Sequence, residues 1–298
     1  MQRRTGIFGI VLLLALFASG ALLSARLLLG GRVPGLTKKR VAVLPVIGVI
    51  NSERRFVEDL NGFREDPSVK AFVLEIRSPG GAVGPSQAIY GELQRLKRED
   101  DRPLIAWIGD VGASGGYYVA LPADSIFALP GSITGSIGVI MQFPNAEELL
   151  RKVGVELEVV KSGRLKDIGS PARDLSEEER QVLQGLVDDV WNQFVEAVVL
   201  GRDLSRARVE ELADGRVYSG ESARDEGLVD RLGTLQDALD AAGRMAGLGE
   251  NPRTVRPAQE KLGLLELLGG VDESRLAKLL GSLSTGARST PRLRYEWP

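Results

Sequence analysis

The chain has 298 residues, of which 43% are hydrophobic and 26% charged, and its net charge is −2. This is the composition of a globular α/β protein, and without a basic excess we expect no nucleic-acid partner. The sequence has no His and no Cys. It therefore excludes disulfides, a Cys nucleophile and metal sites built from these residues. A serine nucleophile would need Lys, a carboxylate or the amino terminus as its base.

The N-terminal segment is uncharged and apolar from Thr5 to Ala25, after two arginines. Its length matches a helix that crosses a bilayer, so we expect residues 1–28 to form a cytoplasmic tip and a transmembrane anchor. A cleaved secretory signal with a small-residue exit near Ala18 is the alternative. Positive charges lie on both sides of the run and leave its orientation open. Residues 29–40, rich in glycine and basic residues, are expected to be a linker.

Short apolar runs then alternate with helical patterns, which predicts an α/β fold with βαβ units and a largely parallel sheet. We expect strands at 41–50, 71–76, 104–108, 125–129, 137–140 and 155–160. We expect helices at 52–65, 85–98, 145–153, 177–200, 206–213 and 234–246, with a short one directly after residue 114. Together these elements predict one folded domain over residues 41–250.

The longest expected helix carries signals at both ends. Ser176 with Glu179 fits a capping box at its start, and Gly201 fits a stop. The tail, residues 251–298, is weakly patterned. It contains two short amphipathic stretches at 262–268 and 276–283, and its last dozen residues are expected to be disordered.

Two glycine-rich motifs follow expected strands. Ser78-Pro79-Gly80-Gly81 contains adjacent glycines whose backbone N–H groups can converge on one point, as in an oxyanion hole, although a tight turn is the simpler interpretation. Ser114 precedes Gly115 and Gly116, so the N–H of Gly115 would accompany an attack by the Ser114 hydroxyl. A helix cap is the alternative for Ser114.

A candidate base lies in the polar, glycine-rich stretch from Lys161 to Pro171. Lys166 acts as a base only if a desolvated site favours its neutral form. Otherwise it is a solvated surface charge, and Lys161 is the competing candidate. In the stretch from Gly131 to Gly138, three hydroxyl side chains could bond a catalytic ammonium, namely Ser132, Thr134 and Ser136. That stretch lacks the Lys-Ser/Thr ending of a phosphate loop, so nucleotide binding is rejected.

Four motifs in this order resemble one known family. They are Ser78-Pro-Gly-Gly81, Ala113-Ser-Gly-Gly-Tyr-Tyr118, Pro130-Gly-Ser-Ile-Thr-Gly-Ser-Ile-Gly-Val139 and Lys161-Ser-Gly-x-x-Lys-Asp-x-x-Ser-Pro-x-Arg173. Over roughly residues 40–245 the chain resembles the short bacterial form of signal peptide peptidase A. This family (peptidase family S49) comprises serine proteases of the Clp/crotonase-like superfamily, built from repeated ββα units. Arg77 departs from the pattern, since many relatives have Asn before this Ser-Pro-Gly-Gly.

The resemblance implies a catalytic role for each motif. Ser114 would be the nucleophile, Lys166 the general base and Ser136 the residue that orients Lys166. The amides of Gly81 and Gly115 would form the oxyanion hole, and no cofactor or metal is implied. These roles agree with the exclusion of His and Cys, because a serine protease without His needs a base such as Lys.

The resemblance also implies a setting. Family members act on signal-peptide remnants and other apolar peptides as ring-like homo-oligomers, in which Ser and Lys come from neighbouring subunits. The N-terminus would lie inside the cytoplasmic membrane and the protease domain, residues 41–250, outside it. Two alternatives remain on the same fold: a crotonase-type acyl-CoA enzyme, which would need basic contacts for the nucleotide, and a non-catalytic membrane scaffold.

Overall fold

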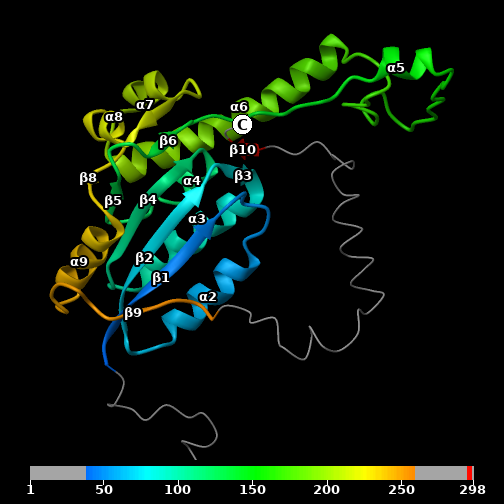
Figure 1. The fold of residues 1–298 in the computed structure, drawn as a ribbon. Helices are drawn as coiled ribbons and strands as arrows, with labels where there is room; N and C mark the ends of the chain where they lie inside the picture. The colour runs from blue at the N-terminus through cyan, green and yellow to red at the C-terminus, as the bar shows by residue number, and fades with distance from the viewer. Residues whose placement is uncertain (1–37, 259–293, 297–298) are drawn as a thin grey trace, which may run out of the picture.

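A computed structural model describes residues 38–258 and 294–296. The expected anchor and the two expected tail helices lie outside these residues. Within the described part of the chain, no helix combines the length and the apolar character needed to cross a membrane. The described residues form an α/β fold around one central sheet, as the alternation of patterns predicts (Figure 1).

The central sheet is mostly parallel, with the strand order β7-β6-β4-β2-β1-β9; β5 branches from β4 and pairs with β8. Only β7 runs antiparallel within this described sheet, where it pairs with β6. A second, two-stranded sheet joins β3 to β10 in antiparallel pairing. The strands are β1 (Arg40–Ile47), β2 (Val69–Ser78), β3 (Gly80–Ala82), β4 (Leu104–Ala113), β5 (Ser125–Ala128), β6 (Ile133–Gly135), β7 (Val217–Ser219), β8 (Arg231–Leu232), β9 (Thr254–Val255) and β10 (Arg294–Glu296).

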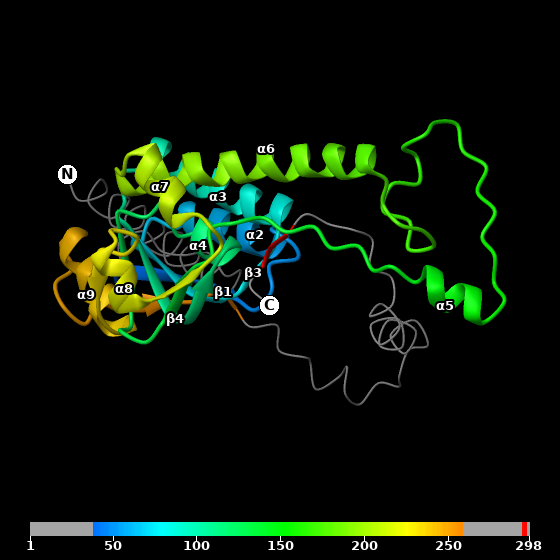
Figure 2. The same ribbon diagram turned by 90° about the horizontal axis from the view of Figure 1, so that it is seen from above.

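Helices cover both faces of the sheet. In Figure 2, α2, α3, α4 and α6 lie on one side of the strands and α9 on the other. The helices are α2 (Arg54–Arg64), α3 (Val83–Glu99), α4 (Gly115–Tyr118), α5 (Glu147–Lys152), α6 (Glu177–Arg202), α7 (Arg206–Leu212), α8 (Gly220–Asp225) and α9 (Leu235–Met245).

The central strands are buried on both faces, as expected of a parallel sheet between helices. In β1, Ala42 and Leu44 face the larger core, which contains residues of α2, α3 and α6. Val41 and Val43 alternate with them and face the smaller core under α9. This continuous burial explains why β1 reads in the sequence as one apolar run.

The segment between β6 and α6 projects from the body as an arm, defined here as residues 141–176. Figures 1 and 2 both show this segment, with α5, extending away from the sheet along the direction of α6. Residues 151–160 are all exposed, and the strand expected at 155–160 is absent. Its β-branched residues meet no partner strand in the described chain, so the local pattern alone does not produce a strand.

Two other local expectations are wrong. The strand expected at 137–140 lies earlier, at β6, because Gly135 and not the following residues pairs with Ala113 of β4. Gly201 does not end the long helix, which continues to Arg202 and is capped by Asp203 in the left-handed conformation. A Cβ on Gly201 would lie 2.8 Å from the Leu121 carbonyl oxygen, so this glycine serves close packing. The capping box of Ser176 and Glu179 is confirmed.

Candidate active site

Two glycine-rich loops meet at the carboxyl ends of β2 and β4. Ser78 at the end of β2 pairs with Gly112 in β4, so the loops after these strands leave the sheet side by side. Gly116 approaches the first loop so closely that a Cβ atom on it would lie 2.5 Å from the carbonyl oxygen of Ser78. Glycine at this position therefore allows the Ser78–Gly81 loop to pack against the residues that follow Ser114.

Ser114 stands at the end of β4 in a strained backbone conformation, with φ 51° and ψ −117°. A non-glycine residue outside the favoured regions costs about 1–3 kcal/mol and persists only where its surroundings hold it. Its side chain is buried (1% exposed), and its Oγ has no hydrogen-bond partner in the described chain. Ser114 occupies the N-cap position of α4, but its side chain accepts no hydrogen bond from that helix. A buried hydroxyl without a partner needs an explanation, and a nucleophile that lacks its base is one.

The amide of Gly81 faces the edge of β3 that is not bonded to Ile50. Ile50 donates to the Gly80 carbonyl at 2.8 Å and accepts from the Ala82 amide at 2.8 Å. Because successive residues of a strand direct their N–H groups to opposite edges, the Gly81 N–H points away from Ile50. On the neighbouring loop, the N–H of Gly115 opens α4 and has no acceptor within that helix. Both amides thus belong to the loops that meet at Ser114.

Ser136 follows β6 just as Ser114 follows β4. The two strands are parallel, and Ala113 pairs with Gly135, so the register places Ser136 beside Ser114 on the neighbouring strand. Adjacent strands lie about 4.8 Å apart, and the Ser114 amide donates to the Gly135 carbonyl at 2.8 Å. Ser136 is buried and also adopts a positive φ of 49°.

The other two hydroxyl candidates in this stretch have structural roles. Thr134 Oγ1 donates to the Gly112 carbonyl at 2.8 Å, and the Ser132 hydroxyl bonds the carbonyl oxygens of Ile108 and Gly109. They fasten the β6 segment to β4. Of the three hydroxyl candidates, Ser136 is therefore the one whose position suits contact with a catalytic ammonium.

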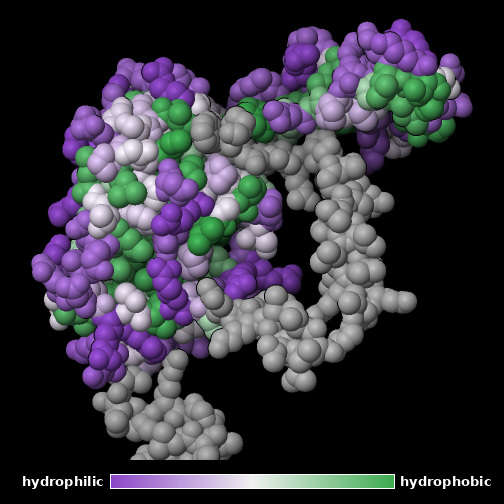
Figure 3. Space-filling model, viewed as in Figure 1, coloured by the Kyte–Doolittle hydropathy of each residue, from purple (hydrophilic) through white to green (hydrophobic). Residues whose placement is uncertain are grey.

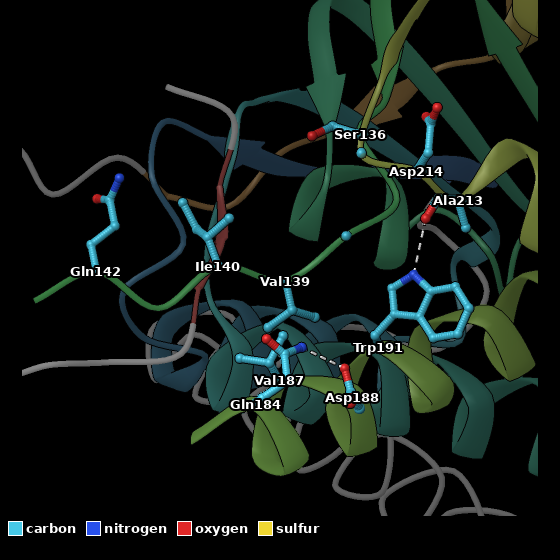
Figure 4. Close-up of a pocket in the computed structure, with 12 residues that line it drawn as sticks. Ser136, Val139, Ile140, Gln142, Gln184, Val187, Asp188, Trp191, Ala213 and Asp214 are labelled. Carbon is cyan, nitrogen blue, oxygen red and sulfur yellow. Dashed lines mark hydrogen bonds between the residues drawn. The ribbon is translucent and has the colours of Figure 1, made fainter. Parts of the chain in front are cut away.

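A cavity of about 670 Å³ opens beside Ser136. Figure 4 shows Ser136 and Asp214 on one side of it and Val187, Asp188 and Trp191, all from α6, on the other. The Trp191 indole donates to the Ala213 carbonyl at 3.0 Å, which fixes that wall. Hydrogen bonds from Arg216 lower the pKa of Asp214 to about 2, so its carboxylate is ionised. The cavity combines an apolar wall with acidic groups at its edge.

Sequence reasoning did not identify this cavity. Its walls come from α6 and from the turn at residues 213–215, which lie far from Ser136 in the chain. No local pattern in the sequence marks the cavity, because contacts between segments far apart in the chain form its walls.

Lys166 is not brought to Ser114 within one chain. It lies in successive turns between Gly163 and Ser170 on the arm, which projects away from the body in both views of the ribbon. Its side chain is exposed, and its ammonium group makes no hydrogen bond or ion pair in the part of the chain that the structure describes. The competitor Lys161 is already engaged, because its ammonium donates to Asp167 at 2.5 Å and to the Arg164 carbonyl at 3.1 Å.

The tyrosines that follow the glycines belong to the core. Tyr117 is fully buried and donates to the Leu228 carbonyl at 2.8 Å. Tyr118 packs against Tyr90 and Phe194, and burial raises its pKa to about 12. Neither is suited to proton transfer near neutral pH.

Arg77 lies over the smaller core. Its guanidinium stacks on Trp107, 5.1 Å from the ring centroid, and pairs with Glu75 and Asp110. Trp107 belongs to the core under α9. The departure from the usual Asn therefore serves contacts on the face of the sheet opposite α3 and α6.

Comparison with known proteins identifies the same family that the sequence motifs resemble. The profile described as Peptidase family S49 matches residues 96–249, a range that includes Ser114, Ser136 and Lys166. A putative protease of Synechocystis is 42% identical over 237 residues, which cover 79% of this chain and 85% of that protein.

Two further relatives carry peptidase names. A putative signal peptide peptidase of Enterococcus faecium is 40% identical over 220 residues, which cover 70% of this chain and 64% of that protein. Protease 4 of Salmonella typhi is 37% identical over 185 residues, which cover 62% of this chain and 30% of that protein. With these matches over most of its length, the chain belongs to peptidase family S49, as its four motifs indicated.

Proposed function

We propose that this protein is a serine endopeptidase in which Ser114 is the nucleophile and Lys166 the general base. The observation that carries the proposal is the buried Ser114 hydroxyl, strained and without a partner at the meeting point of two glycine loops. Gly81 and Gly115 supply the amides of the oxyanion hole, and Ser136 orients the Lys166 amine.

The chemistry is acyl transfer in two steps. The Ser114 Oγ attacks the peptide carbonyl while its proton passes to the neutral amine of Lys166, and the two glycine amides bond the oxyanion that forms. The ammonium of Lys166 then donates its proton to the leaving amine, which leaves an acyl ester on Ser114. Lys166 next takes a proton from water, the hydroxide attacks the ester, and Ser114 recovers its hydrogen as the second product departs.

The base comes from a neighbouring copy of the chain. Ser114 has no lysine partner in its own described chain, and Lys166 stands exposed on the arm. The arm also presents a continuous apolar surface, which Figure 3 displays as green atoms at its end. Its exposed hydrophobic residues are Leu149, Val153, Val155, Leu157, Val159 and Val160. Exposed apolar surface of this kind is typical of an assembly interface, and the cavity beside Ser136 is the place for an incoming lysine.

The proposed substrate class rests on the edge of β3, which can accept an added peptide strand. In the structure, residues 294–296 of the chain pair with this edge as an antiparallel strand. An extended peptide would take their place and align its carbonyl with the Gly81 amide, which is recognition by strand addition. The apolar segment from Thr5 to Ala25 would hold the enzyme in the cytoplasmic membrane with its N-terminus inside. Signal-peptide remnants left in that membrane are apolar and would bind in an extended form once they leave it, and we propose them as substrates of a ring-like homo-oligomer.

The fold is common to this proposal and the two alternatives, and the Ser114 backbone separates them. β2, β3 and α3 followed by β4 form the kind of ββα unit that the Clp/crotonase-like superfamily repeats. An acyl-CoA enzyme would use the two amides without Ser114 and Lys166, and a scaffold would need none of them. The strain at Ser114 has no purpose in either alternative.

Complementation between two inactive variants tests the proposal. Ser114→Ala and Lys166→Ala should each lose peptide cleavage by at least 10³-fold, since residues that act as a unit fail together. When the two variants are refolded together, sites that pair an intact Ser114 with an intact Lys166 should recover activity. Lys161→Ala tests the competing base; because Lys161 only bonds neighbours in the lysine turn, this variant should lose far less activity than Lys166→Ala.

The outcomes separate the parts of the proposal. Substantial turnover by Lys166→Ala would overturn the base assignment. No recovery in a well-mixed hetero-oligomer would overturn the shared site while leaving the Ser/Lys pair within one chain. A full-length protein whose Ser114 fails to react with a fluorophosphonate would favour the scaffold.

A further inference from the structure

We propose that Arg173 is the positioning residue for Lys166: it fixes the turn that carries this lysine to the tip of α6. This proposal rests on the proposed function, in which Lys166 acts on the Ser114 of another copy. A base on a projecting arm is effective only if the arm is rigid, because a misplacement of about 1 Å can cost 10²-fold in rate. The contacts of Arg173 supply that rigidity.

The guanidinium of Arg173 joins two carboxylates that lie six residues before it and six residues after it. On one side it donates to both oxygens of Glu179, at 2.8 and 2.5 Å. On the other side its Nε donates to Asp167 Oδ2 at 3.1 Å and its second terminal nitrogen lies 3.0 Å from Oδ1. The same nitrogen donates to the Asp167 main-chain carbonyl at 3.3 Å. Arg173 therefore holds both the side chain and the backbone of the residue that follows Lys166.

Both carboxylates depend on this cation. Hydrogen bonds from Arg173 and Lys161 hold the pKa of Asp167 well below its usual range. Hydrogen bonds from Arg173 and the Ser176 amide lower the pKa of Glu179 to about 2. The Glu179 side chain is only 3% exposed, so without Arg173 it would be a buried charge lacking its partner. The planar, forked guanidinium suits this double role, which an ammonium cannot reproduce.

Glu179 in turn belongs to the start of α6. Its carboxylate accepts the Ser176 amide at 2.9 Å and its own amide donates to the Ser176 hydroxyl at 3.3 Å, which is the capping box of this helix. The helix has 26 residues and is therefore about 39 Å long. Its C-terminal half packs in the larger core through Val190, Phe194 and Val198. The C-terminal half of α6 is thus packed in the body, and Arg173 bonds the turn that carries Lys166 to the N-terminal end of this helix.

The other side of the turn is also fixed. The Ala146 amide donates to the Pro171 carbonyl at 2.7 Å, and Gly169 packs directly on the Phe143 ring. These contacts tie the outgoing and returning segments of the arm to each other but not to α6. Arg173 connects the lysine turn to the helix, and only one other ion pair of the described residues does so, the exposed pair of Arg164 and Glu178.

That second pair provides a matched control. Arg164 lies on the same turn and donates to both oxygens of Glu178, at 2.5 and 2.8 Å, in the same first turn of α6. Its side chain is 80% exposed and its partner 45% exposed. An exposed pair of this kind contributes little. Arg164→Gln removes the same charge from the same segment without touching Asp167 or Glu179.

The first measurement is steady-state cleavage of an apolar peptide by the full-length protein. Arg173→Gln should lower kcat about 10²-fold with KM within about twofold, while Arg164→Gln stays within about twofold in both. Arg173→Lys should fall between the wild type and Arg173→Gln, because a lysine can reach one carboxylate but not both. Glu179→Gln combined with Arg173→Gln should be no worse than Arg173→Gln alone, since both changes break one contact.

The decisive measurement places Arg173→Gln on one partner of the complementing mixture. On the Ser114→Ala chain, which donates Lys166, it should reduce the recovered activity about 10²-fold. On the Lys166→Ala chain, which donates Ser114, it should have no effect beyond about twofold. A merely structural role for Arg173 would reduce activity equally in both arrangements, and that result would overturn the proposal.

The other possible outcomes distinguish failure of the positioning role from failure of the proposed function. If Lys166→Ala is inactive while Arg173→Gln retains its kcat, the positioning role falls and the proposed function stands. If Lys166→Ala remains active, the proposed function itself falls. If the mixture without Arg173→Gln recovers no activity, the sites are not shared, and the kcat of Arg173→Gln against Arg164→Gln alone supports or overturns the role.

Discussion

A Gly116→Ala substitution would force apart the Ser78–Gly81 loop and the loop that follows Ser114. A Cβ on this residue would lie 2.5 Å from the Ser78 carbonyl oxygen, a backbone atom that has no side-chain freedom to move away. Ordinary contact begins near 3.4 Å, so in a close-packed interior Gly116→Ala requires the Ser78–Gly81 loop or α4 to shift by about 0.9 Å.

We expect this shift to lower kcat about 10²-fold, which corresponds to about 2.7 kcal/mol. The Gly81 and Gly115 amides lie on the two loops that would move apart, and losing one donor to an oxyanion has a cost of this size. KM should change less, because the shift affects the transition state more than substrate binding. The assay is kcat and KM on a Leu- and Ala-rich peptide, with thermal unfolding measured on the same samples.

Gly91→Ala is the matched control. Gly91 lies in the middle of α3, and a Cβ there would meet no atom within 4 Å. Alanine in a helix interior should stabilise the protein by about 0.5–1 kcal/mol and leave kcat unchanged. A folded Gly116→Ala protein with the kcat of the wild type would refute the reasoning, because it would show that the spacing of the two loops does not matter to catalysis.

Two further predictions concern pH. We expect kcat/KM to rise between pH 7 and 9, because a lysine amine accepts a proton only when neutral; a maximum below pH 6 would assign the base to a carboxylate. Asp230→Asn should lower the free energy of unfolding by about 1–2 kcal/mol at pH 7, less than for a fully buried pair because Asp230 is 35% exposed. Burial raises the pKa of Asp230, but hydrogen bonds from Arg202 and the Ile126 amide hold it below its ordinary 3.8. The carboxylate therefore stabilises the fold at neutral pH and loses this effect below about pH 4, so urea unfolding at pH 7 and 3 should give a smaller difference at pH 3.

The sequence predicted the parts of the fold that depend on local pattern. The strands and helices expected between residues 41 and 98 lie within three residues of those observed, but β3 at Gly80–Ala82 was not expected, and β4 continues past the expected 108 to Ala113. The capping box of Ser176 marks the start of α6. These elements are determined by periodicity and by residues close in the chain. Gly201 was misinterpreted because its reason is a backbone contact with Leu121, which no local pattern contains.

The sequence suggested candidate site residues but not how they lie relative to one another in space. The register of β4 and β6 brings Ser136 beside Ser114, and the contact at Gly116 brings the first glycine loop to them. Both relations arise from pairing between distant segments. The apolar run at 155–160 failed as a strand for a related reason. Its pattern indicates burial but cannot indicate what buries it, and the described chain holds no partner for it.

The position of Lys166 on the arm has a consequence for how fast such a protein works in dilute solution. A chain whose Ser114 depends on a lysine from another chain has no complete site while it is alone. Its specific activity then rises with its own concentration, and a plot of rate against enzyme curves upward until assembly saturates. Under the shared site proposed above, a newly made chain would be inactive until it assembles, and a chain with a damaged arm would inactivate the serine of its neighbour and leave its own serine intact.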